Sequence, residues 1–189
     1  MPVAVGPCLR RDDTVVCGGH GIMMTRLRPG IIAALAALAL DQASKLWLLF
    51  VFDIARRHGG AVEVTPFFDL VLQWNTGISY GWFQNEGATG QAVLLAVKAV
   101  AVVVLAIWMA RSRTLLATLA LGLIIGGAIG NAIDRFTYGA VVDFAMFHVQ
   151  IGGKPFYWYV FNLADVAIVA GVAGLLYDSF VGVPAAKAP

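Results

Sequence analysis

Four long apolar segments alternate with polar ones along the 189-residue chain. Each is close to the roughly 20 residues that a helix needs to cross the hydrocarbon core of a bilayer. The pattern therefore predicts four membrane-spanning helices, at about residues 31–53, 91–110, 115–133 and 160–178. Polar segments form an N-terminal tail, two larger loops, one tight turn and a short C-terminal tail.

This arrangement predicts an all-α membrane protein with one four-helix transmembrane domain at residues 25–180. A disordered extension, residues 1–24, precedes the domain, and a short tail, residues 181–189, follows it. Composition agrees, since 60% of the residues are hydrophobic and 13% are charged. We expect a monomer that contacts membrane lipid and no nucleic acid.

The placement of basic residues suggests an orientation. Arg26 and Arg28 precede the first segment, and Arg111 and Arg113 fill the turn between the second and third. Basic residues in short loops favour the cytoplasmic side. We therefore expect cytoplasmic N and C termini and outward-facing larger loops, although the outer side also carries Arg56, Arg57, Arg135 and Lys154.

The first outer loop contains a strand-like pattern. The segment AVEVTPFFDLVLQWNTG, residues 61–77, alternates in part between apolar and polar positions, and Pro66 separates its two β-rich runs. Asn75-Thr76-Gly77 supplies turn chemistry at its end. We predict a small extracytoplasmic β-sheet in this loop, on the outer membrane surface. The aromatic residues Trp74, Tyr80, Trp82 and Phe83 suit an interfacial belt.

Asp41 and Lys45 lie inside the first apolar segment, four residues apart on one helix face, where they can form an ion pair. Each charge at such depth costs roughly 2.5–3.5 kcal/mol on insertion scales, so it normally faces the interior of a bundle. A structural ion pair and a role beside a reaction centre remain equally compatible with this pattern.

Small residues recur at helical spacing in the last two segments. Gly122, Gly126 and Gly130 form a ridge in the third, and Ala167, Gly171 and Gly174 repeat the idea in the fourth. Such ridges let neighbouring helices approach closely and indicate packing rather than chemistry.

Acidic residues gather at the outer end of the predicted bundle. Asp134 ends the third segment, Asp143 follows in the loop, and Asp165 lies about five residues, or roughly 8 Å, into the fourth helix. Asn162 precedes Asp165 by three positions and faces the same way. Two carboxylates in a poorly hydrated place share a proton, which supplies an acid and a base. A turn cap at Asp143 and an interhelical hydrogen bond at Asp165 explain the spacing equally well.

Other chemistries fit the sequence less well. Ser44 and Lys45 are adjacent, so they point in different directions on a helix, and a Ser/Lys pair would have to recruit Ser79. His20, His58 and His148 are scattered singly without HExxH spacing. We therefore expect no metal site and no cofactor.

Five polar blocks resemble, in order, motifs of signal peptidase II, the bacterial lipoprotein signal peptidase family. They are DQASK at 41–45, NTGISYG at 75–81, GGAIGNAIDR at 126–135, VVDF at 141–144 and FNLAD at 161–165. Together they span the chain from the first apolar segment to the last. Ile78-Ser79-Tyr80 and Val166 depart from the commoner family residues and leave both acidic positions intact.

The resemblance implies an aspartic endopeptidase of the bacterial inner membrane, with its active site at the periplasmic face. Such an enzyme cleaves prolipoproteins before a diacylglyceryl-modified cysteine. By motif, Asp143 and Asp165 are the expected catalytic pair. The expected substrate-binding and supporting residues are Asp41, Lys45, Asn75, Asn131, Asp134, Arg135 and Asn162. The alternative is a small proton-coupled transporter that uses the intramembrane acidic residues, although no inverted repeat is visible.

Overall fold

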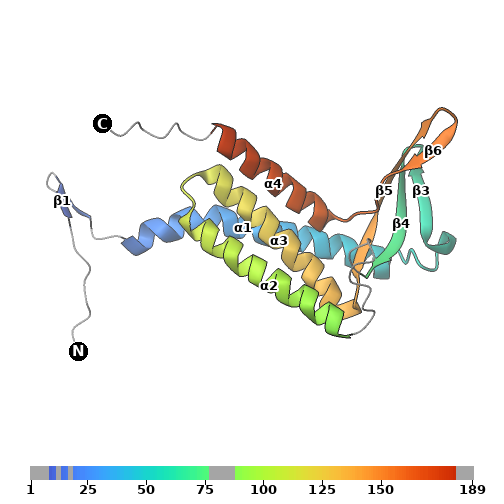
Figure 1. Cartoon of the computed structure of the whole chain (residues 1–189), viewed down its shortest axis with the longest axis horizontal. Coiled ribbons are helices and arrows are strands. Elements are labelled where there is room, and N and C mark those ends of the chain that lie inside the picture. The colour runs from blue at the N-terminus through green and yellow to red at the C-terminus, as the bar shows by residue number, and fades with distance from the viewer. Residues whose placement is uncertain (1–8, 12–13, 17–18, 77–87, 182–189) are drawn as a thin grey trace.

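The computed structural model describes residues 9–11, 14–16, 19–76 and 88–181. Four helices form a bundle with a β-sheet at one end (Figure 1). They are α1, Gly19–Leu46, which continues as the π-helical turn Trp47–Val51, then α2, Ala88–Arg111, α3, Leu115–Tyr138, and α4, Leu163–Val181. Near the N terminus, β1, Leu9–Arg11, pairs antiparallel with β2, Thr14–Val16.

Three segments are long and apolar enough to cross a membrane: Leu27–Val51, Leu115–Tyr138 and Leu163–Val181. They correspond to the first, third and fourth predicted helices. The second predicted helix forms as α2, and its described side chains begin at Leu95. The part of the chain that the structure describes is therefore mostly helical, with three candidate membrane spans and a small antiparallel sheet.

Helix α3 is the centre of the bundle and packs against the other three helices, most extensively against α1 and α4. The predicted glycine ridge explains this closeness. A Cβ atom at Gly122 or Gly126 would overlap the backbone of α1 at Gly30 or Ala34. On α4, a Cβ atom at Gly171 would lie 2.5 Å from the Ala120 carbonyl oxygen. The prediction of close helix packing is confirmed at these positions.

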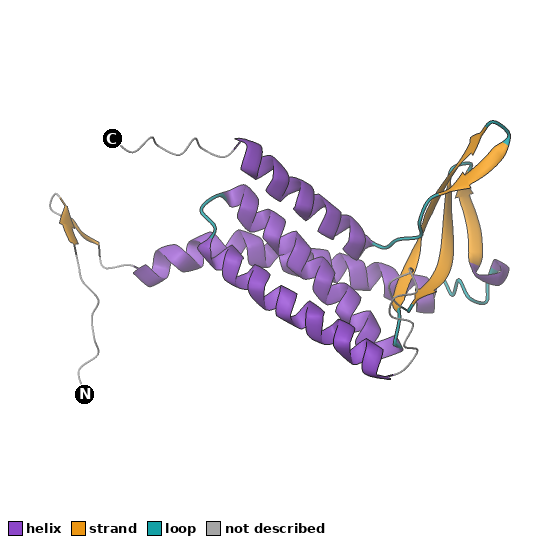
Figure 2. Cartoon of the chain, in the orientation of Figure 1, coloured by secondary structure: helices purple, strands orange, loops and turns teal. Residues whose placement is uncertain are grey.

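The sheet contains four antiparallel strands in the order β3-β4-β5-β6. Strands β3, Ala61–Thr65, and β4, Phe68–Asn75, come from the first of the two larger loops, where strands were predicted. Strands β5, Val141–Ile151, and β6, Lys154–Tyr157, come from the second loop. Figure 2 shows all four strands together beyond one end of the helices.

The prediction that the sheet belongs to the first loop alone was therefore incomplete. An isolated two-stranded hairpin is marginal in water, and additional strands with an apolar face stabilise it. Pairing β4 with β5 does this, because Phe144 and Ala145 pack with Leu48 and Ile54 in a buried cluster. The VVDF segment, interpreted from sequence as loop, is the start of β5.

Candidate active site

The VVDF strand positions Asp143 where the sheet meets the bundle. Asp143 is 2% exposed, and the four residues around it, Val141, Val142, Phe144 and Ala145, are also buried. Asn75, at the end of β4, pairs with Val141 and donates from Nδ2 to Asp143 Oδ2 at 3.0 Å. Two loops that are distant in sequence therefore fix this carboxylate through one strand pair.

Asp165 is placed by the first turn of α4. The helix begins at Leu163, so Asp165 is its third residue and lies closer to the helix start than the predicted five residues. The Asn162 side-chain oxygen accepts from the Asp165 backbone N–H at 3.0 Å. In return, Asp165 Oδ2 accepts from the Asn162 N–H at 3.2 Å. This reciprocal pair is a capping box, which explains why FNLAD begins a helix at this point.

Asn162 also connects the two aspartates. Its Nδ2 atom donates to Asp143 Oδ1 at 2.6 Å, while its backbone N–H donates to Asp165. Asn162 is fully buried, and its bond to Asp143 is shielded from bulk water. A single residue thus holds both carboxylates of the expected pair, and the structure brings Asp143 and Asp165 to one site.

Asn131 of α3 supports the same site from the opposite side. Its Nδ2 atom donates to Asp165 Oδ1 at 2.9 Å, and its Oδ1 atom accepts from Asn162 Nδ2 at 3.1 Å and from Lys45 Nζ at 3.1 Å. The Asn131 amide therefore links the Lys45 ammonium to the Asp165 carboxylate through two hydrogen bonds.

A buried ionic cluster next to the two carboxylates connects three helices and a strand. Lys45 Nζ lies 2.8 Å from Asp41 Oδ2 and 2.7 Å from Asp134 Oδ2, and all three side chains are at most 2% exposed. The predicted Asp41–Lys45 pair is thus confirmed, with Asp134 as a second partner.

Both acids of this cluster also bind backbone N–H groups. Asp41 Oδ1 accepts from the Ala164 N–H at 2.9 Å, which anchors the first turn of α4. Asp134 Oδ2 accepts from the Val142 N–H at 3.1 Å, beside Asp143. Buried charges need such complete pairing because an unpaired ion is costly to desolvate. The cluster therefore fixes the two segments that carry Asp143 and Asp165.

The local electrostatics distinguish Asp143 from its partner. Burial raises the pKa of Asp143, and the nearby charge of Asp165 raises it further, while hydrogen bonds from Asn75 and Asn162 and the charge of Lys45 oppose the shift. Asp165 is only partly buried. Asp143 is therefore the more deeply buried of the two carboxylates, and Asp165 is the more accessible to water.

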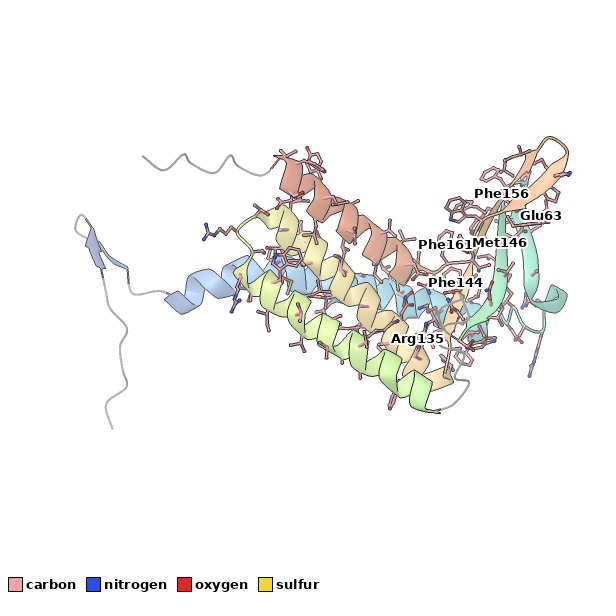
Figure 3. All side chains as sticks on the ribbon, viewed as in Figure 1. Glu63, Arg135, Phe144, Met146, Phe156 and Phe161 are labelled. Atoms are coloured by element: carbon pink, nitrogen blue, oxygen red, sulfur yellow. The ribbon has the colours of Figure 1, made fainter. Side chains whose placement is uncertain are left out.

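Arg135 borders the site on the sheet side. Its Nη1 atom lies 3.5 Å from the Asn75 carbonyl oxygen, and among the residues that the structure describes its buried Nε atom has no hydrogen-bond partner. Figure 3 shows Arg135 with Phe144 and Phe161 at the junction between the helices and the sheet.

Two site features were not identified from sequence. Gln42 donates to Asp41 Oδ2, to the Gly130 carbonyl and to Asp134 Oδ1 at 3.2, 3.2 and 3.0 Å. Its position inside DQASK was the available signal. Gly130 was interpreted only as a packing residue, yet a Cβ atom there would lie 2.5 Å from Asp41 Oδ2. Glycine is therefore needed beside the ionic cluster.

The side chains considered for other chemistries lie elsewhere. Ser44 donates to the Asp41 backbone carbonyl at 2.7 Å, a bond within its own helix. His148 Nε2 lies 3.2 Å from Asp69 Oδ1 on the sheet. Ser79, considered as a partner of Lys45, and the aromatic residues Tyr80, Trp82 and Phe83 lie outside the described residues.

The site contains two carboxylates in different surroundings, and one asparagine donates a hydrogen bond to each of them. A protonated, buried carboxylate can act as a general acid, and an accessible carboxylate can act as a general base. Such a pair can activate a water molecule and protonate a leaving group without a covalent intermediate.

Comparison with known proteins gives one consistent family. Residues 33–181 match the family model described as signal peptidase (SPase) II. A lipoprotein signal peptidase of Nitrobacter hamburgensis is 75% identical over 166 residues, which are 88% of this chain and 100% of that protein. One of Rhodopseudomonas palustris strain CGA009 is 69% identical with the same coverage.

Two solved structures share the fold. One bacterial membrane enzyme, solved in meso at 2.3 Å, has a TM-score of 0.64 and 22% identity, and covers 84% of this chain and 94% of its own. Another, solved at 1.9 Å, has a TM-score of 0.63 and 24% identity, and covers 82% of this chain and 94% of its own. At these identities the likeness concerns the fold alone.

Proposed function

The chain belongs to the signal peptidase II family, and we propose that it is a lipoprotein signal peptidase in which Asp143 and Asp165 form an aspartic catalytic pair. Its substrates are then prolipoproteins, cut before a diacylglyceryl-modified cysteine. The observation that carries this proposal is the position of Asn162, which donates one hydrogen bond to each carboxylate.

In the proposed mechanism, Asp165 is the base and Asp143 is the acid. Asp165 takes a proton from water as the water oxygen attacks the scissile carbonyl carbon. Asp143 then gives its proton to the departing amine nitrogen when the carbon–nitrogen bond breaks. The burial of Asp143 and its raised pKa support this assignment, as does the greater exposure of Asp165. Arg135, which borders the site, is the proposed donor to the polarised carbonyl or to a neighbouring one.

The supporting residues then have separate roles. Asn75 and Asn162 orient Asp143, and Asn131 orients Asp165. The ionic cluster acts indirectly: Asp41 and Asp134 bind the backbone N–H groups of Ala164 and Val142, next to the two aspartates, and Lys45 holds both acids. Arg135 and Asn75 are the candidates for substrate contact.

We further propose that the membrane domain has four spans, with cytoplasmic termini and the sheet on the periplasmic surface of the bacterial inner membrane. Helix α2 supports a fourth span, because its 24 residues extend over about 36 Å. The basic turn with Arg111 and Arg113 lies at the end opposite the sheet, which supports the orientation. Nothing in the family match or the relatives supports the transporter alternative.

The test uses purified protein and a diacylglyceryl-modified prolipoprotein, with signal-peptide loss followed by gel shift. Asp143→Asn and Asp165→Asn should each abolish cleavage while the helical content and thermal unfolding of the protein persist. Asp69→Asn is the matched control, since Asp69 lies on the same sheet outside the site, and it should cleave normally. Near-normal turnover by either dyad variant would refute the catalytic assignment. A chelator should have no effect.

A further inference from the structure

A pocket lies at the end of the bundle opposite the sheet. It has a volume of about 590 Å³ and opens between the α2–α3 turn and the last turns of α4. This is the size range of small-molecule sites. No step of the proposed reaction uses this end of the protein.

The polar groups available in this pocket are mainly cationic. Arg111 and Arg113 line it, both are exposed, and within the described parts of the chain neither forms an ion pair. The hydroxyl groups of the turn are already engaged. Ser112 Oγ donates to the Met109 carbonyl, and Thr114 Oγ1 accepts from the Ala117 N–H. The carboxylate of Asp178 also lines the pocket and leaves an excess of one positive charge.

The remaining walls are mainly apolar and include strongly exposed side chains of α2 and α4. Trp108 and Leu176 line the pocket and are 51% and 56% exposed. Trp108 precedes Arg111 by three residues, so the indole ring and the guanidinium group share one face of α2. A cationic mouth therefore lies one helical turn from an exposed apolar wall.

We propose that this pocket binds an anionic phospholipid, with its phosphate at Arg111 and Arg113 and the upper part of one acyl chain against Trp108 and Leu176. Charge complementarity selects the occupant, because basic pockets between membrane helices on the cytoplasmic side suit anionic headgroups. Inorganic phosphate would leave the apolar wall uncovered. A zwitterionic lipid would bring its own cation toward the two arginines.

The bound lipid bridges the α2–α3 turn and α4. Only 11% of the residues in the apolar window of α4 are buried within the protein, so this helix depends on its surroundings for much of its contact. The opposite end of α4 carries Asp165 in its first turn. The pocket therefore gives an anionic lipid a way to hold α4 in place without contact with the catalytic residues.

The experiment measures quenching of Trp108 fluorescence in nanodiscs, in which both membrane faces have the same composition and orientation does not matter. Phosphatidylglycerol or phosphatidylcholine with brominated acyl chains is added at equal mole fractions to unlabelled phosphatidylcholine. The signal of Trp108 is the difference between the protein and its Trp108→Phe variant. Brominated phosphatidylglycerol should quench it at a lower mole fraction than brominated phosphatidylcholine.

The double variant Arg111→Gln/Arg113→Gln should lose this preference. Each arginine should account for about a five-fold difference in the mole fraction needed for half-maximal quenching, which corresponds to about 1 kcal/mol. Arg56→Gln/Arg57→Gln removes the same charge at the other end of the bundle and should keep the preference. Equal quenching by the two lipids, or an unchanged preference in the Arg111/Arg113 variant, would overturn the proposal. Full displacement of the lipid effect by inorganic phosphate would also overturn it, because it would show an anion site without a lipid component.

Discussion

Replacing Asn162 should reduce catalysis more than the loss of a helix cap explains. Asn162→Ala removes the N-cap of α4, which costs about 0.5–2 kcal/mol of stability. It also leaves buried Asp143 without its 2.6 Å donor, at a cost of about 1–3 kcal/mol. We expect a total loss of about 1.5–5 kcal/mol in the free energy of unfolding.

Asn162→Ser separates the two effects, because serine is a good N-cap and has no amide donor that reaches Asp143. It should regain about 1 kcal/mol of stability relative to Asn162→Ala. Turnover should stay low, because a hydrogen bond to a charged group is worth about 1.5–3 kcal/mol, which corresponds to about a 10- to 150-fold loss of kcat if it acts in the transition state.

The assay combines cleavage kinetics on a diacylglyceryl-modified prolipoprotein with thermal unfolding of the same detergent-solubilised samples. A fall in kcat with little change in KM is expected for both variants, since Asn162 is buried and orients the carboxylates. If Asn162→Ser recovered turnover in proportion to stability, Asn162 would be a helix cap only, and the bridge between Asp143 and Asp165 would have no catalytic role.

Two further predictions concern the acid and the glycine ridge. Because the Asn75 hydrogen bond lowers the pKa of Asp143, Asn75→Ala should raise that pKa. The active form needs a protonated acid, so the fall of kcat on the alkaline side of the pH–rate profile should move to higher pH. An alkaline limb that stays in place or moves to lower pH would contradict the assignment of Asp143 as the acid. Gly130→Ala should displace Asp41, since the added Cβ atom would lie 2.5 Å from Asp41 Oδ2; it should lower stability by about 1–3 kcal/mol in thermal unfolding and should lower kcat. Gly174→Ala should be milder, because its nearest neighbour is the Ala120 methyl carbon at 3.1 Å. Equal effects of the two substitutions would argue against a specific role for Gly130.

The sequence was sufficient for features that depend on neighbouring residues. Helix spacing correctly predicted the Asp41–Lys45 pair and the ridge at Gly122 and Gly126, because residues three or four apart on a helix necessarily share a face. Apolar length predicted the helical segments. The ordered motifs identified the family, which the comparisons confirmed.

The tertiary structure decided what those residues contact. It made Asp134 the second partner of Lys45, and it made VVDF a strand by pairing β5 with β4. In both cases the contacting segments are 60 or more residues apart. Local periodicity contains no information on such contacts. The start of α4 is an intermediate case, since Asn162-Leu163-Ala164-Asp165 contains a capping box that sequence reasoning did not use.

The sequence by itself thus determined where the helices form, which polar residues gather near one end of the bundle, and which family supplies their expected roles. Only the tertiary structure decided that one asparagine holds both aspartates and that Asp143 is more deeply buried than Asp165. The physical reason is that burial and charge depend on every element packed around a side chain. Spacing along the chain depends only on its own helix or strand.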